Sequence, residues 1–255
     1  MRIILLTFML TALPAVVLAK DLVVVVGGSG KTGIEVVKQL TAKEQYELRA
    51  TTRNVGRAKA NIGDDIDWVY ADVKDVSSLR SAIDGADYVI SAIGAGAPGG
   101  ENGPKHIDYQ GVVNLVDICQ ELGVKQFVLT SAIGVGDVDH FLNVLFGNVQ
   151  VWKWLGEDYI HDSGLPYTIV RPGGLSDGPA GHAGIKLAAK GALHGGEIPR
   201  ADVAQVLIES IGNPNAIKKT IEIISDEATE VDLWKADFAS IKVDPADPPR
   251  PARFE

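Results

Sequence analysis

The stretch LVVVVGGSGKTG, residues 22–33, constrains the fold of this chain more than any other part of its sequence. Its first five residues are apolar and mostly β-branched, which predicts a buried strand. The glycine cluster predicts a turn, and residues 32–40 predict a helix. A strand, a glycine-rich turn and a helix in this order occur in two nucleotide-binding motifs, the triphosphate loop and the dinucleotide turn.

The spacing of the glycines separates the two motifs. The triphosphate loop requires G-x-x-x-x-G-K-[ST], and counting back from Lys31 places its first glycine at Val25. The dinucleotide pattern G-x-G-x-x-G fits Gly28, Gly30 and Gly33 without a gap. In that pattern the first glycine permits the tight turn, the second lets the backbone approach a pyrophosphate, and the third lets helix and strand pack closely. We therefore interpret the stretch as a dinucleotide turn, with Lys31 at the helix start near the phosphates.

Strand-like and helix-like segments alternate beyond residue 20. The expected strands are residues 46–53, 66–73, 86–94, 126–132 and 167–172, and the expected helices are residues 76–83, about 109–122 and about 148–162. This rhythm predicts an α/β fold with a doubly wound, mostly parallel sheet, a Rossmann fold. We expect a single domain over residues 20–243, in which residues 173 to about 240 form a small C-terminal lobe. The Pro-rich residues 244–255 are expected to form a flexible tail.

Composition excludes several classes of function. The formal net charge of −9 argues against nucleic acid as a partner, because clustered Lys and Arg drive phosphate binding. The single cysteine, Cys119, excludes an intramolecular disulfide and a cysteine zinc cluster, and five scattered histidines show no paired metal spacing. We therefore expect no metal site. The apolar residues 141–152 indicate a buried helix or a contact surface, of which burial is the simpler expectation, and the oligomeric state stays open.

The N-terminus has the pattern of a targeting segment. Met1 and Arg2 precede an apolar stretch, residues 4–19, that ends in Val-Leu-Ala. We expect residues 1–19 to be a secretory signal peptide, leading to the endoplasmic reticulum lumen, or to a plastid in an alga. An uncleaved anchor and a mis-assigned start site, the latter with a cytoplasmic protein, are the alternatives. Because the stretch is shorter than the roughly 20 residues of a membrane span and contains Pro14, we expect no stable span after signal removal.

The end of the second expected strand indicates which dinucleotide is bound. An NAD-specific site would carry Asp or Glu there to hold the ribose 2′-OH. Arg53 occupies this position, and Arg57 follows one helical turn later. A guanidinium suits the 2′-phosphate of NADP, because it forms bidentate, charge-assisted hydrogen bonds. We therefore predict NADP, with NADPH preferred over NADH; an exposed arginine with no ligand is the alternative.

Seven further blocks carry a family resemblance: TTRN (51–54), ADVKD (71–75), SAIGAG (91–96), DYQGVVN (108–114), VLTSAIG (128–134), VWKWLGEDYIHDSGLPYTIVRPGGL (151–175) and IPRADVA (198–204). Over residues 22–224 the sequence resembles the atypical short-chain dehydrogenases/reductases. It is most similar to the NAD(P)-binding group that contains the NmrA-like proteins, biliverdin reductase B and small plant plastid relatives. The last two blocks are the most specific.

The resemblance implies a set of cofactor contacts. Asp72 and Val73 would flank the adenine, Ala92, Ile93 and Gly94 would line the ribose and pyrophosphate, Thr130 and Ser131 would approach the nicotinamide, and Pro172, Gly173 and Gly174 would cover it. With Arg53, Lys153 and the turn residues Gly28, Ser29, Gly30, Lys31, Thr32 and Gly33, these residues form the predicted cofactor site. Arg200 and Asp202 are expected to be structural and to cap a helix.

The catalytic residues depart from the common pattern of the superfamily. Its better-known members use Tyr-x-x-x-Lys, whose two residues share one helix face. Alignment on the SGLPYTIVRPG block makes Lys153 the lysine and places Val149 at the tyrosine position. Tyr159 is expected to face elsewhere, and Tyr109 and Tyr167 to pack near the sheet. The ordinary mechanism, in which tyrosine passes a proton to the substrate oxygen, is therefore not expected.

Two functional classes remain. In the first, NADPH donates hydride to a ring position of a flavin, quinone or tetrapyrrole, as the resemblance to biliverdin reductase B implies. Lys153 would then hold the nicotinamide ribose, and Ser131 would orient the acceptor or relay a proton. In the second, the protein binds NADP(H) without turnover, as a sensor or assembly factor with a protein partner, which the NmrA-like members imply. We favour the reductase, and expect residues 95–107 and 175–199 to shape its acceptor pocket.

Overall fold

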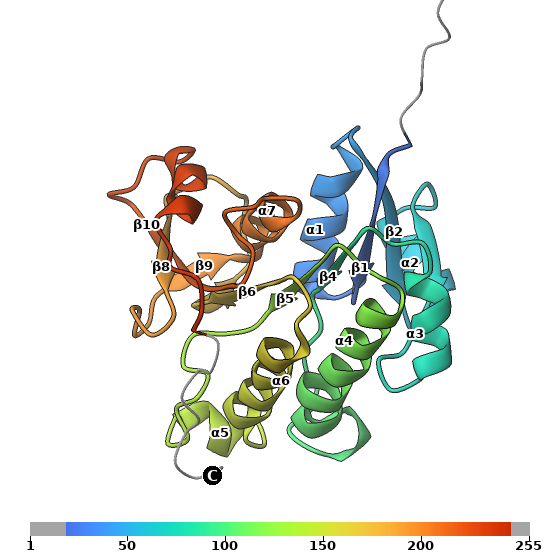
Figure 1. Ribbon diagram of the computed structural model, residues 1–255, viewed down its shortest axis with the longest axis horizontal. Coiled ribbons are helices and arrows are strands. Elements are labelled where there is room, and N and C mark those ends of the chain that lie inside the picture. Colours follow the sequence, from blue (N-terminus) through green and yellow to red (C-terminus); the bar gives the residue numbers. More distant parts are fainter. Residues whose placement is uncertain (1–18, 246–255) are drawn as a thin grey trace, which may run out of the picture.

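The central sheet has eight strands in the order β3-β2-β1-β4-β5-β6-β10-β8. The structure is a computed structural model that describes residues 19–245 (Figure 1). The strands are β1 (Asp21–Val26), β2 (Tyr46–Thr52), β3 (Asp67–Tyr70), β4 (Tyr88–Ser91), β5 (Gln126–Thr130), β6 (Tyr167–Pro172), β8 (Gly184–Ala189) and β10 (Lys219–Asp226). All neighbours are parallel except β8, which runs antiparallel to β10. The predicted doubly wound, mostly parallel sheet is confirmed.

Helices cover both faces of this sheet (Figure 1). They are α1 (Lys31–Thr41), α2 (Val55–Ile62), α3 (Val76–Ile83), α4 (Gly111–Glu121), α5 (Phe141–Leu145), α6 (Val149–Ser163) and α7 (Arg200–Ser210), with the shorter turns η1 (Gly100–Asn102), η2 (Lys105–Gln110) and η3 (Leu233–Ala239). Within residues 19–245, no helix combines the length and apolar character that a membrane span requires.

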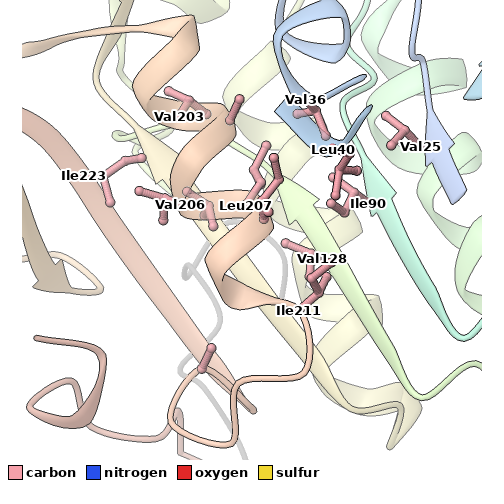
Figure 2. Packing of buried hydrophobic residues seen from close by; sticks show 14 of the residues in the cluster. Val25, Val36, Leu40, Ile90, Val128, Val203, Val206, Leu207, Ile211 and Ile223 are labelled. Atoms are coloured by element: carbon pink, nitrogen blue, oxygen red, sulfur yellow. The ribbon is translucent and has the colours of Figure 1, made fainter. Parts of the chain in front are cut away.

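The four valines of β1 are buried alternately on the two faces of the sheet. Val23 and Val25 pack against α1 and α7, while Val24 and Val26 pack against the cluster formed by α3, α4 and α6. Figure 2 shows the first of these layers, in which Leu207 of α7 faces Leu40 of α1, and Val36 and Val203 belong to the same cluster. An unbroken apolar strand, as opposed to an alternating one, is the expected result when side chains on both faces are buried.

The chain reverses its direction of travel across the sheet between β1 and β4. β2 and β3 add on one side of β1, and β4, β5 and β6 add on the other. Such a switch point opens a crevice at the carboxyl ends of the strands, where ligands of this fold class bind. The site is therefore expected beyond Val26 and Ser91, the last residues of β1 and β4.

The C-terminal part, for which we expected a small lobe, also extends the main sheet. β10 pairs with β6, and α7 packs on α1 (Figure 1). The C-terminal part also contains a separate two-stranded sheet of β7 (Gly174–Ser176) and β9 (Glu197–Pro199). Asp244, the first residue of the expected tail, is held in place, since its Oδ2 accepts hydrogen bonds from Tyr167 at 2.9 Å and Thr220 at 2.7 Å. Residues 246–255 and the expected signal peptide, except for Ala19, lie outside the described part.

The expected burial of residues 141–152 is wrong for the first half. Phe141, Val144, Leu145 and Phe146 are 64%, 87%, 59% and 49% exposed. α5 has only five residues, and Gly147, two residues after its end, packs so closely that a Cβ would lie 1.7 Å from the carbonyl oxygen of Pro98. A helix this short covers little apolar surface, so its apolar side chains remain in solvent while Asn143 is buried.

Candidate functional site

Gly27 makes the tight turn after β1, a role that the sequence interpretation gave to Gly28. Its φ is +81°, a conformation that L side chains rarely adopt, and its carbonyl accepts the backbone N–H of Gly30 at 2.9 Å. A Cβ on Gly27 would also lie 3.1 Å from the carbonyl oxygen of Ala92. The spacing G-x-x-G-x-x-G of Gly27, Gly30 and Gly33 is the signal that would have identified this residue.

Gly28 and Gly33 have packing roles. A Cβ on Gly28 would meet Cβ of Ala50 on β2 at 3.0 Å. A Cβ on Gly33 would lie 2.2 Å from the carbonyl oxygen of Gly27, so that only glycine allows α1 to start directly against the turn. Gly30 is the N-cap of α1 and makes no side-chain cap, and the first turn has no acidic residue. The free N–H groups and the partial positive charge of this helix start are therefore suited to an anion such as a phosphate.

A cavity of about 480 Å³ opens beside this turn, at the carboxyl ends of β1, β2, β3 and β4. Of the predicted site residues it is lined by Ser29, Gly30, Arg53, Asp72, Val73, Ala92, Ile93 and Gly94. Residues outside the predicted cofactor set also line it: Val26, Gly27, Thr51, Thr52 and Ala71, and, from the segment 95–107 that was expected to shape the acceptor pocket, Gly96, Ala97, Asn102 and Ile107. The hydroxyl of Thr51 accepts the backbone N–H of Gly27 at 3.1 Å, and Ser29 and Thr52 share a hydrogen bond of 2.9 Å. These bonds tie the turn to the end of β2.

Lys31 and Thr32 begin α1 but do not line the cavity. Nζ of Lys31 lies 3.3 Å from Oδ2 of Asp177, and both side chains are 71% exposed. Asp177 also accepts a hydrogen bond from Arg200. The loop after β7 is thus attached to the start of α1 by an exposed ion pair, which contributes little to stability.

The expected helix cap at Arg200 and Asp202 is wrong. α7 is preceded by Pro199 and has no side-chain cap. Oδ1 of Asp202 accepts the backbone N–H of Gly181 at 2.7 Å, and burial raises the pKa of this carboxyl group. Both residues therefore hold the loop after β7 against α7 instead of capping the helix.

A second, smaller cavity of about 10 Å³ lies next to the larger one, toward β5. We call the two cavities together the groove. Its lining residues are Ile93, Asp108, Val112, Leu129, Thr130, Ser131 and Lys153, and Ile93 is shared with the larger cavity. The hydroxyl of Thr130 is buried and has no hydrogen-bond partner within residues 19–245. A buried hydroxyl without a partner is costly, so this atom is suited to a ligand polar group.

Lys153 is held at this cavity by Asp108. Its Nζ lies 2.7 Å from Oδ1 of Asp108, whose Oδ2 accepts the backbone N–H of Ala95 at 3.1 Å. Asp108 is only 3% exposed. Close packing of α6 on η2 makes the pair possible, because a Cβ on Gly156 would lie 2.6 Å from the carbonyl oxygen of Asp108. Asp108 begins the DYQGVVN block but was not predicted as a site residue.

Ser131 is attached to a buried ionic network. Its hydroxyl donates to Oε1 of Glu157 at 2.5 Å, and Arg171 binds the same carboxylate with Nε at 3.0 Å and Nη2 at 2.5 Å. Glu222 lies 3.6 Å from Nη1 of Arg171 and accepts backbone N–H groups of the 191–193 loop. Burial acts to raise the pKa of Glu157, but the charge and hydrogen bonds of Arg171 outweigh it and hold this pKa below its ordinary value. The carboxylate beneath Ser131 is therefore ionised at neutral pH.

The tyrosines of the chain lie away from the two cavities. None of the six tyrosines, all within residues 19–245, lines either cavity. Tyr159 donates to Oδ1 of Asp117 at 2.6 Å, and this bond raises its pKa to about 12. Tyr109 stacks on Trp152 with ring centroids 6.0 Å apart, and Tyr167 donates to Asp244. Tyr159 faces away from both cavities and Tyr167 lies in β6, as expected, whereas Tyr109 packs on a residue of α6.

Pro172, Gly173 and Gly174 do not line either cavity. The backbone N–H of Gly174 donates to the carbonyl oxygen of Gly196 at 2.8 Å, and a Cβ on Gly173 would lie 2.4 Å from that oxygen. This segment joins β6 to the small sheet of β7 and β9. No group of three or more His, Cys, Asp or Glu side chains in the described chain could hold a metal ion.

The sequence matches the family model described as NAD(P)H-binding over residues 27–214. The chain belongs to this NAD(P)H-binding family. The match begins at the glycine turn and ends after α7, so it covers the whole groove. The predicted resemblance to NAD(P)-binding relatives of the short-chain dehydrogenases/reductases is confirmed.

Two relatives and one solved structure illustrate the similarity. An uncharacterised chloroplastic protein of Arabidopsis thaliana is 37% identical over 86% of this chain and 82% of its own length. The sanguinarine reductase of Eschscholzia californica is 32% identical over 72% of this chain and 82% of its own length. A putative NAD-dependent epimerase/dehydratase from Bacillus halodurans has a TM-score of 0.73 and 27% identity over 86% of this chain and 99% of its own. The relatives thus share the fold across the groove and include a reductase.

Proposed function

We propose that this protein is an NADPH-dependent reductase whose acceptor is a flavin-, quinone- or tetrapyrrole-like ring that receives hydride without a tyrosine acid. The observation that carries the proposal is the groove, in which an uncapped helix start, a cavity of about 480 Å³ and the pair Lys153 and Ser131 follow one another along the strand ends. The family membership and the similarity to a reductase support it.

Residues along the groove suit the separate parts of a dinucleotide. The N–H groups at the start of α1 suit the pyrophosphate, and Asp72 and Val73 line the cavity where the adenine would lie. Arg53 lines the same cavity at the end of β2 and suits a 2′-phosphate. The unpartnered hydroxyl of Thr130 lies at the opposite end of the groove, suited to a nicotinamide. When bound, NADPH supplies the hydride.

Lys153 would hold the nicotinamide ribose. An ammonium has three N–H donors, and the bond to Asp108 uses one of them. The remaining donors are available for ribose hydroxyls, and Asp108 fixes the direction of the side chain. The ion pair lies in a mostly buried position, since the side chain of Lys153 is 16% exposed and that of Asp108 is 1% exposed.

Ser131 would orient the ring compound by accepting a hydrogen bond from it. A serine hydroxyl can donate one hydrogen bond, and here the ionised carboxylate of Glu157 accepts that bond. The lone pairs of Ser131 are therefore left for the cavity, where they suit an N–H or O–H of the ring compound. Of the two roles expected from the sequence, this geometry favours orientation over proton relay, and the proton that completes the reduction would come from solvent.

The decisive experiment follows NADPH oxidation with flavin mononucleotide, menadione and biliverdin as acceptors, in the wild type and in Lys153→Met. The proposal predicts turnover of at least one acceptor and a loss of about tenfold or more in kcat/KM in the variant. Thermal unfolding of both proteins controls for folding, because the variant leaves Asp108 buried without its partner.

The second candidate function is binding of NADP(H) without turnover, in a sensor or assembly factor with a protein partner. The observation that favours it is the absence of a tyrosine from both cavities, with Val149 at the usual tyrosine position. Tight binding of NADPH together with no reduction of any of the three acceptors would support this function and reject the reductase.

We also propose a plastid as the destination of the protein. The Arabidopsis relative is named as a chloroplastic protein. Of the two destinations expected for a chain with a signal peptide, this similarity favours the plastid over the endoplasmic reticulum lumen. The full chain fused to a fluorescent protein should co-localise with chlorophyll in an algal cell. Retention in the endoplasmic reticulum would contradict this.

A further inference from the structure

Two exposed cations converge on one amide oxygen at the rim of the larger cavity. Nη1 of Arg53, after β2, lies 3.4 Å from Oδ1 of Asn102, and Nζ of Lys74, after β3, lies 3.3 Å from the same atom. Arg53 and Asn102 line the cavity, so the convergence point is at its edge. Lys74 was not predicted as a site residue.

No carboxylate neutralises these two cations. Neither Arg53 nor Lys74 takes part in an ion pair within residues 19–245, although the chain has a formal net charge of −9. The two acids beside Lys74 in sequence accept backbone N–H groups: Oδ1 of Asp72 accepts that of Lys74 at 3.0 Å, and Oδ1 of Asp75 accepts those of Ser77 and Ser78 at 3.1 and 3.2 Å. Two positive groups held next to each other by a neutral oxygen repel each other, and an anion between them would remove the repulsion.

The backbone around the two cations is fixed. Asn54 caps α2 by accepting the backbone N–H of Arg57 at 2.9 Å, so a helix start with its partial positive charge follows Arg53 directly. Asn102 ends η1, a tight turn in which a Cβ on Gly103 would lie 2.7 Å from Cα of Gly99. The amide is thus presented from a third segment, across the cavity from the strand ends.

From this geometry we propose that Lys74 is the second cation of the 2′-phosphate site, and that Asn102 holds Lys74 and Arg53 in place until the phosphate binds between them. The proposal rests on the proposed function for the identity of the cofactor. Both bonds to Asn102 are long for charged donors, so a phosphate forms stronger bonds with the same nitrogens. Selection of NADPH over NADH then depends on three segments of the chain: the ends of β2 and β3, and η1.

The test compares the dissociation constants of NADPH and NADH, measured by tryptophan fluorescence, for the wild type, Lys74→Ala and the control Lys59→Ala. Lys59 is an exposed cation in the last turn of α2, so its loss changes the net charge equally. Lys74→Ala should weaken NADPH binding about tenfold and NADH binding less than about twofold. Lys59→Ala should leave the ratio of the two constants within about twofold of the wild type.

A second variant tests the role of the amide. Asn102→Asp places a carboxylate between the two cations, where it would compete with the phosphate, so NADPH should bind about tenfold more weakly while NADH is little affected. Equal effects of Lys74→Ala and Lys59→Ala on NADPH, or a wild type that does not prefer NADPH to NADH, would overturn the proposal. A protein that selects NADPH through Lys74 but reduces no acceptor would refute the reductase and leave this site intact.

Discussion

The hydroxyl of Ser131 donates to Glu157 at 2.5 Å, and Arg171 binds the same carboxylate from the other side. Of these three residues, only Ser131 lines the small cavity, so the buried ion pair of Glu157 and Arg171 reaches the cavity through the hydroxyl group of Ser131. Glu157 lies one helical turn after Lys153 on α6, so a single helix carries both Lys153 and the carboxylate that binds Ser131. We treat Glu157 as a positioning residue, because it acts on the cavity through Ser131.

Replacement of Glu157 by glutamine should destabilise the protein strongly. Arg171 is 2% exposed and would lose most of its compensating charge, and removal of one partner of a buried ion pair costs about 3–5 kcal/mol. Urea unfolding of Glu157→Gln measures the loss. Glu35→Gln is the control, since Glu35 forms a pair with Lys38 on the surface of α1 and such pairs contribute at most about 1 kcal/mol. Equal effects of the two changes would contradict the buried-network account.

Stability should fall in acid as Glu157 takes up a proton. The pKa of this carboxyl group is lower in the folded protein than its ordinary value of 4.5. Its contribution is therefore present above about pH 4.5 and disappears as the pH falls through the depressed pKa. The free energy of unfolding between pH 7 and pH 3 should decrease less steeply in Glu157→Gln than in the wild type. A parallel pH dependence in both proteins would show that Glu157 does not titrate as proposed.

Ser131 and Tyr159 should differ in their effects on turnover. Ser131→Ala removes the group that faces the acceptor and should lower kcat/KM about tenfold while NADPH binding changes little. Tyr159→Phe removes a hydroxyl that is bonded to Asp117, away from both cavities, and should leave kcat/KM within about twofold. Steady-state kinetics with the best acceptor make the comparison. A large loss in Tyr159→Phe would show that the tyrosine moves into the site.

Two neighbouring glycines should respond differently to alanine. In Gly33→Ala the new Cβ would lie 2.2 Å from the carbonyl oxygen of Gly27, so the turn and α1 must separate at a cost of about 3 kcal/mol or more. In Gly30→Ala the corresponding distance is 3.2 Å and φ is −77°, so the fold should lose only about 1 kcal/mol. Chemical denaturation measures both. Similar stability of the two variants would contradict the close approach at Gly33.

The sequence was sufficient to predict the six strands from β1 to β6 because the signals for them are local. The apolar run of β1, the glycine turn and the alternation of segments up to β6 depend on nearest neighbours in the chain. α2 and the joining of β8 and β10 to the main sheet were not predicted. Pairing between β6 and β10 connects residues about 50 positions apart, and no pattern within either strand specifies it.

The candidate site was predicted in part for the same reason. Arg53 and Lys153 stand at positions fixed by strand ends and motif spacing, and the structure places both at the groove. Asp108, Glu157 and Lys74 were missed because their roles arise from partners that are distant in sequence. Gly27 was missed because two glycine spacings overlap in GGSGKTG and the positive φ distinguishes them only in three dimensions.

The measurement that tests the central claim most directly is a fluorescence titration of residues 20–255 with NADPH, NADH and ATP, with Trp152 and Trp154 near Lys153 as reporters. If the groove is a dinucleotide site that reads the 2′-phosphate, NADPH should bind at least about tenfold more tightly than NADH, and ATP more weakly than either. Equal binding of NADPH and NADH would remove the role given to Arg53 and Lys74. Failure of both to bind, or tight binding of ATP alone, would contradict the dinucleotide assignment itself.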